Sequence, residues 1–346
     1  METITTLSQL LTNSGCEFRI FDLGRRISPI EHKEFFDVEK GLLPYPYPLQ
    51  RKAHVAIAYW NEQQQPWIWF LKFELDERGL LKQAEIGQFL KYVMEAMGSR
   101  LSQEISEEQQ QKLANNPYTY KPSEDKMAVF HSQIRAALNL PTSQYYEHAQ
   151  HYFQGGLGWD NWQTVGLQGI TDMCARLSQD NNQVTLRKSL NHLPNEPLYA
   201  LLGALEHTQT PEKLAARLLD MANQQLQSGD ADLFLVSALV RALSGAPNAL
   251  RSLVDDILAS PTFSHQEVLI GIAGRAWQVL DDTGVATRFL VRLAETGNQT
   301  LFNQLFADLV MIPKLRMVLL PLLHSSPSPE LAQALTALQR SAKGSA

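Results

Sequence analysis

The chain has 346 residues, of which 44% are hydrophobic and 19% charged, with a formal net charge of −6 at pH 7. This composition is ordinary for a folded globular protein and excludes a chain that is disordered throughout. There are 14 basic and 18 acidic residues up to Asp125, and 16 and 18 after it. Neither part has the basic excess that binding to a nucleic-acid backbone requires, so we expect no nucleic-acid partner.

Cysteine content and hydropathy argue against a disulfide-rich, secreted or membrane protein. Cys16 and Cys174 are the two cysteines, far apart in sequence, so there is neither a disulfide framework nor a CxxC metal site. The N-terminal METITTLSQLLTNSG has no basic region followed by an apolar run, so it does not resemble a signal peptide. The apolar stretch MVLLPLL (317–323) is short and contains Pro321. We therefore expect a cytoplasmic protein with no membrane-spanning segment and no membrane partner.

Residues 1–115 are predicted to form a small α+β domain, an antiparallel sheet with helices on it. The third predicted strand is the clearest, because Trp67, Trp69, Leu71, Phe73 and Leu75 alternate onto one face. The helix after it has apolar residues at 3/4 spacing and is expected to cover the sheet. The predicted elements are a helix over residues 3–13, strands over 17–23, 53–60 and 67–75, and helices over 83–97 and 102–116.

The segment after this domain is rich in proline and polar residues. NPYTYKPSED (116–125) marks the boundary, and residues 116–160 are predicted to be a linker with connecting helices. Residues 161–340 are predicted to form an all-α, HEAT-like helical-repeat domain. Residues 341–346 are predicted to be a disordered tail.

The repeat prediction rests on recurring helical segments. Segments that start at Asn195, Asp230, His265 and Asn298 are 35, 35 and 33 residues apart, and each is followed by a partner helix. A two-helix unit with this period is typical of an α-solenoid, and an irregular helical bundle is the alternative. The small residues Gly203, Ala238 and Ala273 share one place in successive segments, and we expect them to let neighbouring helices approach closely.

The glycine-rich HYFQGGLGWDNW (151–162) invites a comparison with a phosphate loop. It follows a predicted helix, and neither the dinucleotide fingerprint nor Gly-Lys-Ser/Thr is present. We interpret it as a joint between helices, with Gly155 or Gly156 ending the first helix and Asp160 capping the next. His148 and His151, three residues apart, supply only two possible metal ligands, so no metal site and no cofactor are predicted.

The segment FDLGRRISPIEHK (21–33) contains the candidate binding residues Asp22, Arg25 and Arg26. Ser28 as N-cap and Pro29 as first helical residue predict a helix start beside the paired arginines. Two guanidinium groups at a helix N-terminus can hold a carboxylate or phosphate. The alternative is that they are solvated or pair with nearby carboxylates.

Three stretches carry a resemblance to a known family: FDLGRRISPI, the pair HVAIAYW and PWIWFLKFELDERGLL, and FQGGLGWDNWQTVGLQGITD. On these, the chain resembles an uncharacterised proteobacterial domain-of-unknown-function family over nearly its whole length. The resemblance implies a bacterial, cytoplasmic protein and brings no activity or catalytic residue.

No combination of nucleophile, base and acid stands out in the sequence, which favours a non-enzymatic protein. The leading hypothesis is therefore an interaction or adaptor protein whose helical-repeat surface binds a protein or peptide. The alternative is a small-anion-binding protein or enzyme with a site at Asp22, Arg25 and Arg26. A homodimer formed through an exposed sheet edge is compatible with both.

Overall fold

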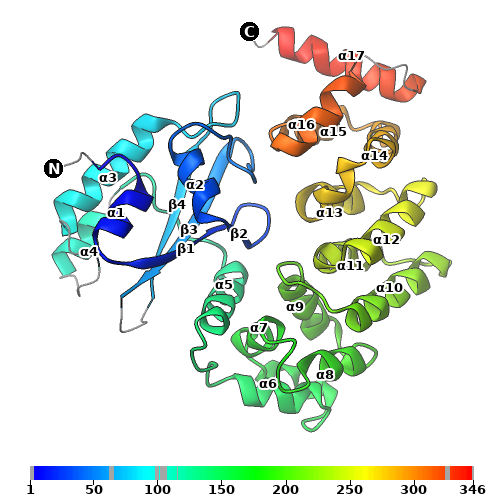
Figure 1. Cartoon of the computed structure of the whole chain (residues 1–346). Helices are drawn as coiled ribbons and strands as arrows, with labels where there is room; N and C mark the ends of the chain where they lie inside the picture. The colour runs from blue at the N-terminus through cyan, green and yellow to red at the C-terminus, as the bar shows by residue number, and fades with distance from the viewer. Residues whose placement is uncertain are drawn as a thin grey trace. The chain divides into compact units, whose positions relative to one another are not determined.

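The fold is described by a computed structural model, which covers residues 4–61, 66–97, 101, 107–114, 116–323 and 328–344. The chain forms two compact units (Figure 1). Unit 1 comprises Met1–Ser123 with Met311–Pro313, and unit 2 comprises Glu124–Val310 with Lys314–Ala346. An antiparallel sheet with helices in unit 1 and a run of helices in unit 2 confirm the predicted fold class.

The boundary between the units lies between Ser123 and Glu124. The sequence predicts a connecting region over residues 116–160, whereas residues 124–160 here belong to unit 2, because their helices pack against the helix over Leu167–Ala175. The C-terminal helix ends at Gly344 and so includes part of the predicted disordered tail. Residues 345–346 of that tail lie outside the described residues.

Unit 1 is built around a four-stranded antiparallel sheet with the strand order β2-β1-β3-β4. Its elements are α1 (Leu7–Asn13), β1 (Glu17–Asp22), β2 (Ser28–Ile30), α2 (His32–Glu39), β3 (Lys52–Trp60), β4 (Trp67–Glu74), α3 (Gln83–Met97) and α4 (Glu107–Ala114). The first part of the predicted polar helix, residues 102–106, lies outside the described residues.

One face of the sheet forms the core of unit 1. Trp69, Leu71 and Phe73 of β4 are buried on this face, as the alternation of apolar residues predicts. Helix α3 covers it with four apolar side chains at helical spacing: Ile86, Phe89, Leu90 and Val93. The predicted bounds of β3, β4 and α3 differ from the observed ones by at most one residue.

The outer edge of β4 is engaged by a segment of the same unit. The amide of Lys72 donates to the carbonyl of Tyr118 at 2.7 Å, and the amide of Tyr120 donates to the carbonyl of Phe70 at 3.1 Å. These bonds occupy backbone groups through which a second sheet would otherwise pair. The other edge strand, β2, is three residues long. Dimerisation through a sheet edge stays a prediction. The β4 edge is partly occupied and the β2 edge is short, so both leave few backbone groups for a second chain.

The prediction that a helix starts at Ser28 and Pro29 is wrong. Residues Ser28–Ile30 form strand β2, paired with β1 in the register Ile20↔Ile30 and Asp22↔Ser28. Proline is tolerated there because β2 is an edge strand. Helix α2 starts four residues after Ser28, at His32. Ser28 and Pro29 are typical of a helix start, but hydrogen bonding to β1 places them in a strand instead.

Unit 2 is a long run of helices. They are α5 (Glu124–Ala137), α6 (Tyr146–Phe153), η1 (Trp159–Thr164), α7 (Leu167–Ala175), α8 (Asn182–Ser189), α9 (Asn195–Leu205), α10 (Glu212–Gln227), α11 (Leu233–Ala242), η2 (Leu243–Gly245), α12 (Pro247–Ala259), α13 (Gln266–Arg275), η3 (Trp277–Asp281), α14 (Thr283–Glu295), α15 (Gln299–Leu309), α16 (Pro313–Leu322) and α17 (Pro329–Gly344), where η marks a 3₁₀ helix.

The helices of unit 2 stack in two layers. Helices α5, α7, α9, α11, α13 and α15 contact one another in this order and form what we call the first layer. Helices α6, α8, α10, α12 and α14 do the same and form the second layer. Figure 1 shows the pairs following one another in chain order. The unit is therefore a stack of helix pairs, and its assignment to the HEAT class stays a prediction.

The repeat period is visible in the capping residues of the first layer. Asp232, His265 and Asn298 are the N-caps of α11, α13 and α15, at intervals of 33 residues. Each side chain accepts a hydrogen bond from a backbone amide in the first turn of its helix. These caps lie within two residues of the predicted segment starts, so the pattern of the sequence located the units well.

The prediction that Gly203 lets neighbouring helices approach closely is wrong. A β-carbon at Gly203 would meet no atom within 4 Å, so no neighbouring helix depends on its small size. The close approach occurs instead at Gly271 of α13, where a β-carbon would lie 2.7 Å from Ser237 Oγ of α11. Counted from the N-caps, Ala238 and Gly271 share the sixth position, so the register read from the sequence was shifted in α13.

The segment 151–162 joins helices, as predicted, and holds a short 3₁₀ helix. Gly155, with φ of 82°, follows the C-cap of α6 in the left-handed region. The Trp159 ring packs edge-on against Tyr152 and stacks on His192. Asp160 lies in the first turn of η1, where Gly158 is the N-cap, so the predicted capping role of Asp160 is wrong.

Candidate functional site

Asp22, Arg25 and Arg26 lie at the end of β1 and in the turn that leads to β2. Asp22 and Arg25 are 0% exposed, and Arg26 is 7% exposed. The sequence suggested that these side chains are accessible at a helix start. They are instead buried at a turn between two strands.

Asp22 and Arg25 make internal contacts that brace the turn. The Asp22 carboxylate accepts hydrogen bonds from the amides of Gly24 and Arg25, both at 3.1 Å, and from the Tyr45 hydroxyl at 2.8 Å. Arg25 Nε donates to the carbonyl of Pro48 at 2.8 Å. Burial raises the pKa of Tyr45, and the charge of Asp22 raises it further. The cluster ties the turn to the segment before β3, and the anion site stays a prediction.

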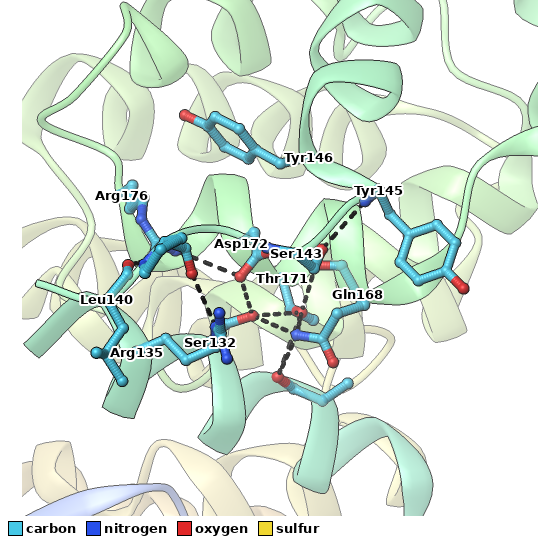
Figure 2. A network of polar contacts seen from close by, with 12 residues as sticks. Ser132, Arg135, Leu140, Ser143, Tyr145, Tyr146, Gln168, Thr171, Asp172 and Arg176 are labelled. Carbon is cyan, nitrogen blue, oxygen red and sulfur yellow. Dashed lines mark hydrogen bonds and ion pairs between the residues drawn. The ribbon is translucent and has the colours of Figure 1, made fainter. Parts of the chain in front are cut away.

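A second buried polar cluster connects α5 and α7 in unit 2 (Figure 2). Ser132 of α5 donates to Asp172 of α7 at 2.8 Å, and its Oγ lies 2.9 Å from Thr171 Oγ1. Gln168 donates to Ser132 at 2.6 Å and to the carbonyl of Ala128 at 3.1 Å. Each of these polar groups has a partner within the cluster. The cluster therefore fixes how two first-layer helices pack.

Asp172 also holds the loop between α5 and α6. Its second oxygen accepts a hydrogen bond from the Ser143 amide at 2.9 Å. Arg176 Nη1 lies 3.3 Å from the first oxygen, and Arg176 Nη2 donates to the carbonyl of Leu140 at 3.2 Å. Figure 2 shows Arg176 and Ser143 on opposite sides of Asp172. Because both charges are buried and fully engaged, this ion pair has a structural role.

The histidines and cysteines do not form a metal site in the part of the chain that the structure describes. No group of three histidine, cysteine or carboxylate side chains is placed to hold an ion there. His148 Nε2 lies 3.0 Å from Thr164 Oγ1, and the His151 ring lies against Gly156. Burial raises the pKa of the Cys174 thiol well above its ordinary value, which keeps it protonated and unreactive.

Three charged residues meet near the C-terminal ends of α9, α11 and α13. Glu206, the C-cap of α9, has one carboxylate oxygen 3.3 Å from Arg241 Nε and the other 3.0 Å from Arg275 Nε. One buried carboxylate is thus shared by two partly exposed guanidinium groups. No sequence motif marks these residues, although their separations of 35 and 34 residues are close to the repeat period.

The same helices carry apolar side chains that are open to solvent. Phe234, on α11, is 65% exposed and Ile270, on α13, is 42% exposed. Counted from the N-caps, these residues occupy positions two and five, and Arg241 of α11 occupies position nine. Positions two, five and nine recur at i, i+3 and i+7, so they share one face of a helix. Phe234 and Arg241 therefore share one face of α11, and we call the solvent-exposed parts of α11 and α13, with Phe234 and Ile270, the first-layer face.

The comparison with known families covers almost all of the chain. Residues 2–339 match the family described as "Protein of unknown function (DUF3549)". The chain belongs to this family. The match runs through both the sheet-containing unit and the helical stack. Neither a curated protein nor a solved structure matches the chain.

Within residues 4–61, 66–97, 101, 107–114, 116–323 and 328–344, no helix combines the length and the apolar character needed for a membrane crossing.

Proposed function

We propose that this protein is a non-enzymatic, cytoplasmic interaction protein, and that the first-layer face of unit 2 binds a protein or peptide partner. The observation that carries the proposal is the exposure of Phe234 and Ile270 on two adjoining helices, α11 and α13. Single exposed apolar residues are common on protein surfaces. Helices α11 and α13 also carry the partly exposed Arg241 and Arg275, and aromatic and arginine side chains are enriched in binding hot spots.

The stacked architecture supports this proposal. Helices α7, α11, α13 and α15 each contact first-layer neighbours and at least one second-layer helix, and α11 and α13 still leave Phe234 and Ile270 exposed. Extended surfaces of this kind are how helical-repeat proteins bind their partners. The HEAT-like character of the stack belongs to this proposal.

The alternative at Asp22, Arg25 and Arg26 is the weaker of the two. An anion site needs donors that can turn toward a ligand, whereas Arg25 is fully buried and its Nε already donates to Pro48. We therefore place the binding function on unit 2. Light scattering of the purified chain tests self-association through either surface.

The proposal is tested by replacing the two exposed apolar residues with charged ones. The variant Phe234→Asp, Ile270→Asp is compared with the parent chain in affinity capture from cell extract at moderate salt. Met317→Asp on α16 is the matched control, because Met317 is also exposed and apolar but lies outside the first layer. The proposal expects proteins that the parent and the control retain to be lost from the double variant. Equal retention by all three chains contradicts it.

A further inference from the structure

Helix α1 is attached to the rest of unit 1 by one polar group. The amides of Leu7 and Ser8 donate to the Glu39 carboxylate at 2.6 and 3.2 Å, and the Ser8 hydroxyl also donates to it. Among the described residues, every other hydrogen bond of α1 stays within residues 5–16. Glu39 is the last residue of α2 and is 0% exposed. The hydrogen bonds that attach α1 therefore depend on a single buried carboxyl group.

The chain is built so that α1 can leave without disturbing the sheet. Gly15, with φ of 70°, turns the chain between α1 and β1, and a β-carbon there would meet no atom within 4 Å. Strand β1 is held separately, because all of its residues pair with β3. Besides the bonds to Glu39, apolar packing holds α1, since Leu7, Leu10 and Leu11 are fully buried.

Glu39 has no counter-charge among the described residues. Helix α1 carries no ionisable side chain. The ionisable residues on or next to α2 and β1, the elements that contact α1, are Cys16, Glu17, Arg19, Asp22, His32, Lys33, Glu34, Asp37 and Lys40. None of them contributes to the shift in the pKa of Glu39. Burial raises that pKa to about 7, against the hydrogen bonds from Ser8 and Leu7, which lower it.

A protonated carboxyl group preserves the attachment of α1. One oxygen still accepts from the Leu7 amide, and the hydroxyl can donate to Ser8 Oγ. An ionised carboxylate makes the same contacts, but its charge is buried without a cation, whereas release of α1 would let water solvate it. We propose that Glu39 is a pH-operated latch, which docks α1 while the carboxyl is protonated and favours its release, with the sheet intact, when the carboxyl ionises.

The direction and size of the response follow from linkage. Because docking raises the pKa of Glu39 above 4.5, protonation stabilises the docked state fully below pH 4.5, and this contribution is lost as pH rises to about 7. Between pH 5 and pH 8 the ratio of released to docked α1 is expected to rise about 70-fold. The latch therefore responds close to neutral pH, and its opening exposes Leu7, Leu10 and Leu11.

Hydrogen exchange of the full chain, followed by mass spectrometry, tests the latch. Labelling times are scaled at each pH for the intrinsic exchange rate, and the protection of α1 is compared with that of the central strand β3. The ratio of β3 protection to α1 protection is expected to rise about 70-fold from pH 5 to pH 8. This comparison is made within the parent chain and needs no variant.

Two variants assign the response to Glu39. Glu39→Gln keeps a carbonyl that accepts from Leu7 but does not ionise, so its protection ratio is expected to stay constant over the same range. Glu74→Gln is the matched control, because Glu74 is an exposed carboxylate of the same unit and pairs with Lys82. The control is expected to keep the pH dependence of the parent chain.

Cys16 gives a second readout, because it lies three residues after α1 and is 8% exposed. Its labelling by a thiol reagent is expected to be faster in the parent than in Glu39→Gln, by a factor that grows with pH. Thiolate formation rises with pH in both chains, so comparing the two chains at each pH isolates the release of α1. Cys174, buried in unit 2, is expected to react equally in both.

Three results would overturn the latch. The first is a protection ratio in the parent chain that does not change with pH. The second is the same pH dependence in Glu39→Gln, which would assign the response to another group. The third is a loss of protection in β3 that keeps pace with that in α1, because unit 1 would then unfold as a whole.

Discussion

A β-carbon added to Gly271 of α13 would lie 2.7 Å from Ser237 Oγ of α11. The two helices are neighbours in the first layer, and the Ser237 hydroxyl donates to the carbonyl of Glu267 at 3.2 Å. A side chain at residue 271 would therefore displace the Ser237 hydroxyl, whereas the next atoms lie at an ordinary contact distance of 3.6 Å. We expect Gly271→Ala to stabilise the chain less than an unhindered Gly→Ala change in a helix does, because the Ser237 hydroxyl must give up a hydrogen bond worth about 1 kcal/mol, as measured by chemical denaturation.

Gly203 supplies the matched control for that substitution. It lies inside α9, and a β-carbon there meets no atom within 4 Å. Gly203→Ala is therefore expected to raise the free energy of unfolding by about 0.5–1 kcal/mol, since alanine favours the helix. Equal effects of the two substitutions would contradict the assignment of close helix approach to Gly271.

Gly245, in η2, lies against the backbone of the loop after α9. A β-carbon there would be 1.8 Å from the carbonyl oxygen of Thr208, and a backbone atom has no rotamer through which to move away. We expect Gly245→Ala to lower the free energy of unfolding by about 3 kcal/mol or more. Gly229→Ala, which meets no atom within 4 Å, is the control in the same denaturation series. A change below about 1 kcal/mol at Gly245 would show that this loop yields easily.

Glu39 of α2 makes the stability of unit 1 depend on pH. Its carboxylate accepts hydrogen bonds from the amides of Leu7 and Ser8 and from the Ser8 hydroxyl, at the start of α1. Burial nevertheless raises its pKa from the ordinary value of 4.5 to about 7. The folded chain thus prefers protonated Glu39, and its stabilising contribution is complete below pH 4.5 and lost as pH rises to about 7.

The free energy of unfolding is therefore expected to fall by about 3 kcal/mol through this group over that range. Denaturation curves for Glu39→Gln should lack this decline, because glutamine does not ionise. Glu74→Gln is the control: Glu74 is exposed and its pKa is lowered by Lys82, so the slope between pH 4.5 and 7 should persist. A slope that survives Glu39→Gln would assign the pH dependence to another group.

Replacing the buried Asp172 is expected to lower the free energy of unfolding of unit 2 more than replacing an exposed carboxylate does. Replacing it with alanine leaves buried Arg176 without its ionic partner and Ser132 without its acceptor. The expected loss of unfolding free energy is about 3–5 kcal/mol. Asp255→Ala, which removes a partly exposed carboxylate from Arg251 and Arg288, should cost no more than about 1 kcal/mol. Similar losses for the two variants would show that burial does not determine how much these ion pairs contribute to stability.

Regular patterns in the sequence predicted most of the fold. The alternation in β4 and the 3/4 spacing in α3 gave correct elements because each pattern is repeated over many residues. The helix start predicted at Ser28 and Pro29 was wrong, since two residues cannot distinguish a helix start from an edge strand whose partner lies elsewhere in the chain. The close helix contact was assigned to Gly203 rather than Gly271, because a sequence repeat does not specify helix rotation.

The candidate site was harder to predict than the fold. Glu206, Arg241 and Arg275 meet only because three helices stack in register, and their separations resemble the repeat period without forming a motif. Asp22 and Arg25 formed a compact motif, yet their burial depends on Tyr45 and Pro48, more than twenty residues away in the chain. Exposure, which decides whether a charge is available to a ligand, is a property of the packed fold.

Site-specific photo-crosslinking tests the central claim, that the first-layer face binds a protein partner, most directly. A photo-reactive phenylalanine analogue is placed at Phe234, at Ile270 or, as a control, at exposed Ser252 of the second-layer helix α12. The account predicts protein adducts of one shared mass at Phe234 and Ile270, which an excess of the unlabelled parent chain competes away, and no such adduct at Ser252. Adducts at Ser252 alone, or none at the two first-layer positions, would contradict it.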